Sequence, residues 1–145
     1  MIICDEYLAL AALRKSSPLQ NSQEQIAITP AAWTRALRSR HNIDNPQQVV
    51  EGQLSDIIGR LSPDGRAKLA TPDPRVLTIL DPRPFLDTTA RLSAVYRMSY
   101  MAAEMAAASI FHQAPLLFAV EGNVPPGIRD LLQFEDLPGL SVAAN

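Results

Sequence analysis

Three short runs of the sequence are almost wholly apolar, and they constrain the fold more than any other feature. They cover residues 1–4, 76–80 and 115–120, and the first of them ends at Asp5. A strand that is buried on both faces has this composition, because neither row of its side chains meets water. The three runs therefore predict strands inside a sheet that helices cover on both faces.

Most of the sequence between these runs has the residue pattern of helices. The clearest example begins directly after Asp5, with an acid first and a base last, as the helix dipole favours. The segment 26–28 is too short to assign as a strand, whereas 137–142 is expected to form a last edge strand. We expect helices over residues 6–15, 30–40, 46–61, 82–96 and 99–113, and a short helix that ends near residue 133.

The alternation of strands and helices predicts an α/β fold. Consecutive strands that are joined through helices run in parallel, because each helix returns the chain to the same end of the sheet. The sequence has no internal repeat and no convincing linker, so residues 1–145 are expected to form a single domain. We therefore expect three layers, with a mainly parallel central sheet flanked by helices.

Charge and cysteine content exclude several kinds of site. The net charge is −2, so the chain as a whole does not attract polyanions. Arg35, Arg38, Arg40 and His41 lie close together, either as a small basic face or as the solvated end of a helix. Cys4 is the only cysteine, which excludes an internal disulfide and any cysteine-based zinc site.

The sequence shows no segment of the kind that enters or crosses a membrane. No run approaches the roughly 20 apolar residues that span a bilayer. The N-terminal apolar run is too short for a signal peptide, because Asp5 and Glu6 interrupt it at once. We therefore expect a soluble, cytoplasmic protein without a membrane partner.

Two stretches of the chain share their order of elements with a known family. Residues 1–13 (MIICDEYLALAAL) combine an apolar strand, an aspartate at its end and a helix rich in Ala and Leu. Residues 78–123 combine a strand that ends in aspartate, a helix, an Ala-rich helix around 102–104 and a strand that begins at Pro115. In this pattern, which covers about two thirds of the chain, the sequence resembles the PIN-domain family and within it the VapC-type toxins of toxin–antitoxin pairs.

The resemblance implies an activity and a set of partners. PIN-domain ribonucleases hold one or two Mg²⁺ or Mn²⁺ ions with three or four carboxylates at the ends of strands and helices. Such ions lower the pKa of the attacking water and neutralise the charge that develops on the phosphate. By resemblance we also expect RNA as the substrate, an antitoxin-like protein as a partner, and a homodimer.

Most of the family's acidic positions carry other residues in this chain. The first acid is present as Asp5, and the resemblance makes it a metal ligand. No acid occurs within residues 32–35, where the second acid belongs. The third and fourth acids align with Ala102 and Val120, and a neighbouring Ser/Thr aligns with Phe118.

Two glutamates are candidates to replace the lost acids. Glu104 lies two positions after Ala102, which is about 200° round a helix, and as an ordinary helix carboxylate it needs no further role. Glu121 follows Val120 by one position, which reverses its face in a strand unless the chain bends there. The predicted catalytic set is therefore Asp5, Glu104 and Glu121.

Two functions agree with this degenerate active site. The first is a PIN-like protein of the toxin–antitoxin type that is a metal-dependent endoribonuclease of altered or impaired activity. The alternative is a catalytically inactive PIN-like module that binds or regulates protein partners, with Ala102, Phe118 and Val120 filling the former pocket. An unrelated α/β protein with the same pattern stays open, as does a functional role for the loop at 121–127.

Overall fold

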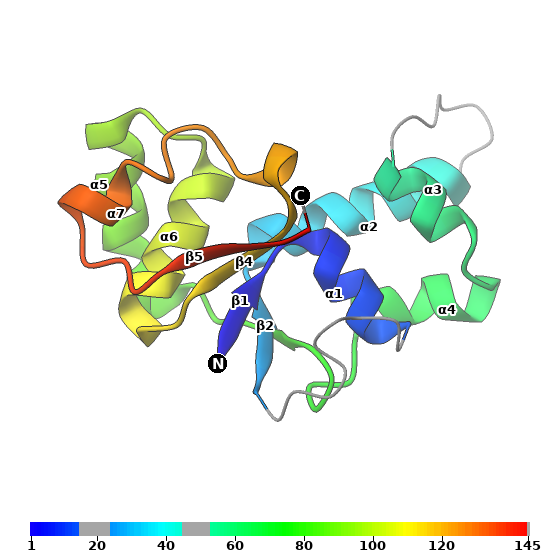
Figure 1. The fold of residues 1–145 in the computed structure, drawn as a ribbon. Coiled ribbons are helices and arrows are strands. Elements are labelled where there is room, and N and C mark those ends of the chain that lie inside the picture. The colour runs from blue at the N-terminus through cyan, green and yellow to red at the C-terminus, as the bar shows by residue number, and fades with distance from the viewer. Residues whose placement is uncertain (15–23, 45–52, 145) are drawn as a thin grey trace.

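The computed structural model describes residues 1–14, 24–44 and 53–144, which form one sheet between two layers of helices (Figure 1). The strands are β1 (Ile2–Cys4), β2 (Ile26–Ile28), β3 (Thr78–Ile79), β4 (Leu116–Val120) and β5 (Leu140–Ala144). They lie in the order β3–β2–β1–β4–β5, and every neighbouring pair is parallel. The predicted fold class, a three-layer α/β arrangement with a parallel central sheet flanked by helices, is confirmed.

Helices cover both faces of the sheet. In Figure 1, α1 lies on one side of the strands, and α5, α6 and α7 lie on the other. None of the described helices is long and apolar enough to cross a membrane. The α-helices are α1 (Glu6–Leu13), α2 (Pro30–Asp44), α3 (Gln53–Gly59), α4 (Pro63–Ala67), α5 (Leu86–Tyr96), α6 (Tyr100–His112) and α7 (Leu131–Phe134), and the 3₁₀ turns are η1 (Lys68–Ala70), η2 (Arg83–Phe85) and η3 (Glu121–Asn123).

Three strands differ from the sequence prediction, and the last of them, expected over 137–142, is β5 (Leu140–Ala144). Residues 26–28, which looked too short, form β2 because β1 and β3 both pair with it and supply hydrogen bonds from each side. The strand expected over 76–80 is shorter, since the backbone N–H groups of Val76 and Leu77 both donate to the carbonyl of Asp73 at 2.9 Å. The expected helix over 46–61 is seen as α3 in its later part, and residues 45–52 lie outside the described ranges.

Helix α6 packs closely on the sheet because its buried residues are mostly alanines, whose side chains are single methyl groups. It contacts β1 and β4, and the side chain of Ser99 caps its first turn by accepting a hydrogen bond from the Ala102 N–H at 3.2 Å. Alanine favours the helix and lets the backbone approach a neighbouring element. The buried alanines of this helix are Ala102, Ala103, Ala106, Ala107 and Ala108.

Trp33 fixes the far end of the core. Its side chain is 1% exposed, and its indole N–H donates a 2.9 Å hydrogen bond to the carbonyl of Leu69. Leu69 lies in η1 and is itself buried. The bond therefore ties α2 to the segment that leads into β3.

We expect Trp33→Phe to lower the free energy of unfolding by about 2 kcal/mol, because it leaves the buried Leu69 carbonyl without its donor. Urea unfolding followed by circular dichroism measures this change without relying on tryptophan fluorescence. Arg38→Ala on the same helix, at an exposed position, is the matched control and should change stability by less than about 0.5 kcal/mol. Equal effects of the two substitutions would contradict the structural role of the indole.

Candidate functional site

The strand order places a crevice at the carboxyl ends of β1 and β4. From β1 the chain builds the sheet outward through β2 and β3, and then crosses over to add β4 and β5 on the opposite side. In open parallel sheets, ligands bind outside the carboxyl ends of the strands at the point where the order reverses. Asp5 directly follows β1 and η3 directly follows β4, so both border this point.

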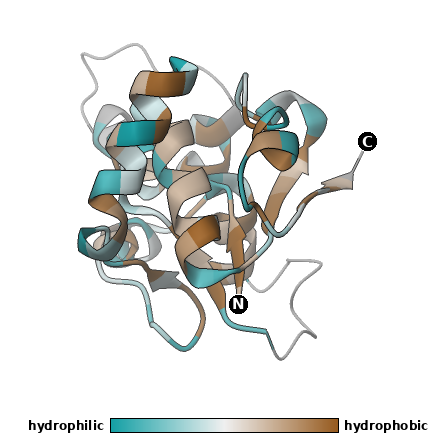
Figure 2. Cartoon of the chain, turned by 90° about the vertical axis from the view of Figure 1, so that its left-hand side faces the viewer, coloured by the Kyte–Doolittle hydropathy of each residue, from teal (hydrophilic) through white to brown (hydrophobic). Residues whose placement is uncertain are grey.

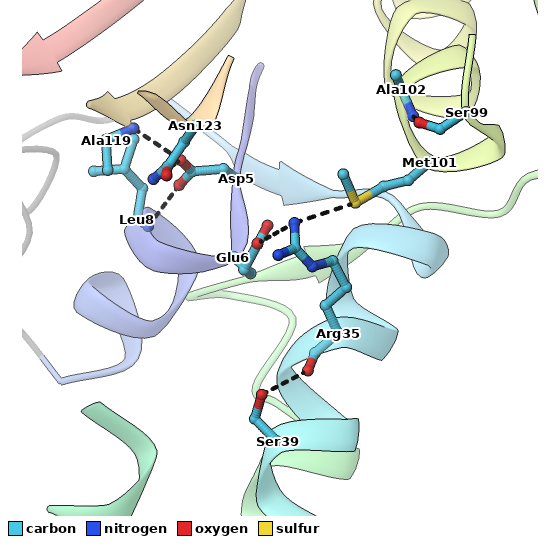
Figure 3. A network of polar contacts seen from close by, with 10 residues as sticks. All are labelled: Asp5, Glu6, Leu8, Arg35, Ser39, Ser99, Met101, Ala102, Ala119 and Asn123. Atoms are coloured by element: carbon cyan, nitrogen blue, oxygen red, sulfur yellow. Dashed lines mark hydrogen bonds and ion pairs between the residues drawn. The ribbon is translucent and has the colours of Figure 1, made fainter. Parts of the chain in front are cut away.

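The Asp5 carboxylate is 2% exposed and fully engaged by neighbouring groups (Figure 3). Its Oδ1 atom accepts a hydrogen bond from the Leu8 N–H at 2.9 Å, which caps α1. Its Oδ2 atom accepts from the Ala119 N–H at 2.9 Å and from the Asn123 side-chain amide at 3.3 Å. Asp5 thus joins β1, α1 and the end of β4.

Glu6 and Arg35 form an ion pair beside Asp5. The Arg35 Nη1 atom lies 3.1 Å from Glu6 Oε1 and also donates to the Met101 sulfur at 3.8 Å (Figure 3). The Glu6 side chain is 4% exposed, whereas that of Arg35 is 52% exposed. Burial raises the pKa of Glu6 above its ordinary value, the Arg35 charge opposes this, and the Asp5 charge adds to it.

Glu104 is buried, and its carboxylate is directed at the start of α2. Its Oε1 atom accepts a 2.8 Å hydrogen bond from the Ala31 N–H, and its Oε2 atom accepts one of 2.9 Å from the Tyr100 hydroxyl. A carboxylate at a helix N-terminus satisfies a free backbone donor and meets the positive end of the helix dipole. Glu104 therefore joins α6 to α2.

The structure does not bring the three predicted catalytic residues together as one metal site. Glu121 is exposed, and both of its oxygens pair with Arg129 at 2.6 Å. The oxygens of Asp5 and Glu104 are held by the separate donors described above. Among residues 1–14, 24–44 and 53–144, no three His, Cys, Asp or Glu side chains are grouped so that they could hold a metal ion.

Apolar residues occupy three of the positions where the resemblance implied polar groups, and two of these residues are buried. Ala102 and Phe118 are each 1% exposed and belong to the core. Val120 is 37% exposed, so it lies at the surface rather than inside a pocket. At these two buried positions the chain therefore offers no side-chain ligand for a metal ion.

A small polar cavity remains at the mouth of the crevice. It measures about 260 Å³, and Glu6 and Arg35 form one of its walls. Ser99 and Met101 border it from the start of α6, and residues 122–126 close it from the loop after β4. A half-exposed guanidinium and a buried carboxylate offer a donor and an acceptor to a small polar group, without a nucleophile that is already activated.

Sequence reasoning missed the pairing of Glu6 with Arg35 and the contact of Asn123 with Asp5. The sequence places Arg35 in a basic cluster and Asn123 in the loop at 121–127, and it predicts neither contact. Glu6 and Asn123 offered a signal, since each lies shortly after the end of a strand, whereas Arg35 lies within α2 and offered none. Cys4 needs no functional role, since burial raises the pKa of its thiol and keeps it protonated.

Comparison with known proteins does not assign the chain to a family. No model of a known protein family matches the sequence, and no curated protein matches it significantly. The function is therefore inferred from the geometry of the site.

The Glu6–Arg35 pair predicts a specific pH dependence. The pKa of Glu6 in the folded state lies above the ordinary value of 4.5, which it takes in the unfolded chain. The free energy of unfolding therefore falls as the pH rises from the unfolded-state pKa to the folded-state pKa. Arg35→Gln removes the opposing charge and raises that pKa further. We expect the destabilisation by Arg35→Gln to be about 1–2 kcal/mol larger at about pH 7.5 than at about pH 4.

Urea unfolding at the two pH values measures this difference. The double variant Glu6→Gln/Arg35→Gln is the matched control, because it lacks the titrating group and should lose the extra pH dependence. If Arg35→Gln lowered the free energy of unfolding by the same amount at both pH values, the ion pair would not stabilise the fold.

Proposed function

We propose that this chain is a PIN-like domain that acts by binding a protein partner rather than by metal-dependent cleavage of RNA. The observation that carries the proposal is the state of the buried carboxylates at the carboxyl edge of the sheet. Asp5 accepts three hydrogen bonds, Glu6 is paired with Arg35, and Glu104 holds the start of α2. Each of the three has a structural partner.

A divalent ion would have to compete with these partners. Hard cations need several oxygen ligands, and the family is expected to use three or four carboxylates for them. A hydrogen bond to a charged group contributes about 1.5–3 kcal/mol, and Asp5 accepts two from backbone N–H groups. Turning Asp5 toward a metal would therefore uncap α1 and release the end of β4.

A second candidate is the metal-dependent endoribonuclease of altered activity. It is favoured by the adjacency of Asp5 and Glu6, which is close enough for the Asp5 charge to raise the pKa of Glu6. Arg35 is half-exposed on the cavity, so its movement into solvent would leave the Glu6 carboxylate facing that space without its partner. Mg²⁺ or Mn²⁺ bound there would supply an activated water.

The helical layer of α5, α6 and α7 supports a protein partner. Figure 2 looks onto this side, where apolar and polar stretches alternate along the helices. Large apolar side chains gathered on one layer are typical of surfaces that bind other proteins. We propose that this layer meets a second copy of the chain or an antitoxin-like protein. Its most exposed members are Leu86, Val95, Tyr100, Phe111 and Phe134, each at least half exposed.

The two functions differ in their response to Mn²⁺. We expect no RNA cleavage above background with Mg²⁺ or Mn²⁺, and no Mn²⁺ binding tighter than about 1 mM by calorimetry, because the carboxylate oxygens are already bonded. The variants to compare are Glu6→Gln, which keeps the fold contacts of Asp5, and Asp87→Asn, an exposed helix acid that serves as the control.

Cleavage that requires Mn²⁺, is lost in Glu6→Gln and is retained in Asp87→Asn would overturn the binding proposal and establish the nuclease. Asp5→Ala is a poor first choice for this assay, since it also removes the cap of α1 and so changes the fold.

Self-association tests the helical layer. We expect the wild-type chain to form a dimer in sedimentation experiments. Phe134→Asp should weaken this dimer about tenfold, because the substitution replaces an apolar side chain that is 68% exposed with a charged one. Gln133→Asp adds the same charge at the neighbouring exposed position and should leave the dimer intact. A wild-type chain that stays monomeric at about 100 μM would argue against the homodimer.

A further inference from the structure

A second, larger cavity lies away from the crevice, between the end of α1 and the segment from 61 to 76. It measures about 530 Å³, which is within the range of small-molecule sites. Leu10 and Leu69 are buried at its base, and Leu13 and Leu61 are half-buried in its walls. Val76 borders it at 38% exposure. The cavity is thus lined mainly by aliphatic side chains.

The base and one wall of this cavity are held in place by hydrogen bonds from residues outside it. The Trp33 indole holds the Leu69 carbonyl at 2.9 Å, and the Arg66 guanidinium holds the Leu61 carbonyl at 2.8 Å. A cavity that is already formed loses little conformational freedom when a ligand enters it, which favours binding.

The charges that border the cavity are mainly positive. Arg14 and Lys68 line it, are exposed, and have no ion pair with any residue of the described ranges. The lining acid, Asp73, is bound by Arg75, which approaches both carboxylate oxygens. Lysine and arginine place their stems along apolar surface and their charged ends in water. Two cations therefore stand at the mouth of an aliphatic cavity.

We propose that this cavity binds an amphipathic anion, an unbranched aliphatic chain that ends in a carboxylate or another single anionic group. The aliphatic chain would pack between Leu10, Leu13 and Leu69, and the anionic end would meet Arg14 and Lys68. Charge complementarity selects this ligand over a neutral or cationic amphiphile. The inference does not depend on the function proposed above, since the cavity shares no residue with the crevice.

Calorimetry with decanoate tests the proposal on the intact chain. We expect one decanoate to bind in the micromolar range, and octanoate to bind at least about tenfold more weakly, because each buried methylene contributes about fourfold in affinity. 1-Decanol and decyltrimethylammonium have the same chain with a neutral and a positive end, and both should bind more weakly than decanoate.

Substitutions at the two cations separate a specific site from general detergent binding. Arg14→Gln/Lys68→Gln should weaken decanoate binding about tenfold and leave 1-decanol binding unchanged, because only the anion loses an attraction. Arg38→Gln removes an exposed charge elsewhere and is the matched control. Val76→Trp should fill the cavity and abolish binding of both molecules.

Three results would overturn the proposal. They are the absence of decanoate binding, equal binding of decyltrimethylammonium, and an Arg14→Gln/Lys68→Gln variant that binds decanoate as the wild type does. The first would leave the cavity to an apolar side chain of a partner protein. The cation variants change only exposed side chains, so they decide the question even if Val76→Trp does not fold.

Discussion

The carboxylate of Asp5 joins parts of the chain that are far apart in sequence, and the architecture of the crevice depends on it. One oxygen holds the first turn of α1, and the other holds Ala119 and Asn123. A buried carboxylate is stable only when such donors replace the water it has lost. Its hydrogen bonds therefore set the angle at which α1 leaves the sheet and the place where β4 ends.

This arrangement shows how a catalytic pattern and a structural role compete for the same atoms. An aspartate at the end of the first strand is suited both to bind a metal and to cap the helix that follows. In the described structure, backbone N–H groups of the protein donate hydrogen bonds to the Asp5 carboxylate. The Glu104 carboxylate likewise accepts a hydrogen bond from a backbone N–H group at the start of α2. The binding proposal follows from this use of both acids, whereas the nuclease would require at least one of them to be released.

The sequence was most informative where local composition alone decides the structure. Continuous apolar runs predicted β1 and β4 closely, and the Ala-rich pattern predicted α6. The prediction was less successful for β2, because a three-residue strand owes its existence to neighbours on both sides. It was also less successful for β3, where a turn based on Asp73 removes the first residues of the expected strand.

The candidate site was harder to predict because its contacts connect distant segments. Glu104 is separated from Ala31 by 73 positions, and no local sequence pattern indicates the hydrogen bond between them. The helical angle did indicate that Glu104 points away from the side of Ala102. It could not indicate that the start of α2 lies next to this carboxylate and donates a hydrogen bond to it.

Helix α2 connects the two cavities of the molecule. Arg35 lines the smaller one, while Trp33, two positions earlier and about 200° round the helix, holds Leu69 at the base of the larger one. A ligand that shifts Leu69 would act on the same rigid helix that carries Arg35. If a ligand in the larger cavity changes the affinity of the smaller cavity by some factor, thermodynamic linkage requires the reverse effect. A ligand in the smaller cavity then changes the affinity of the larger cavity by the same factor.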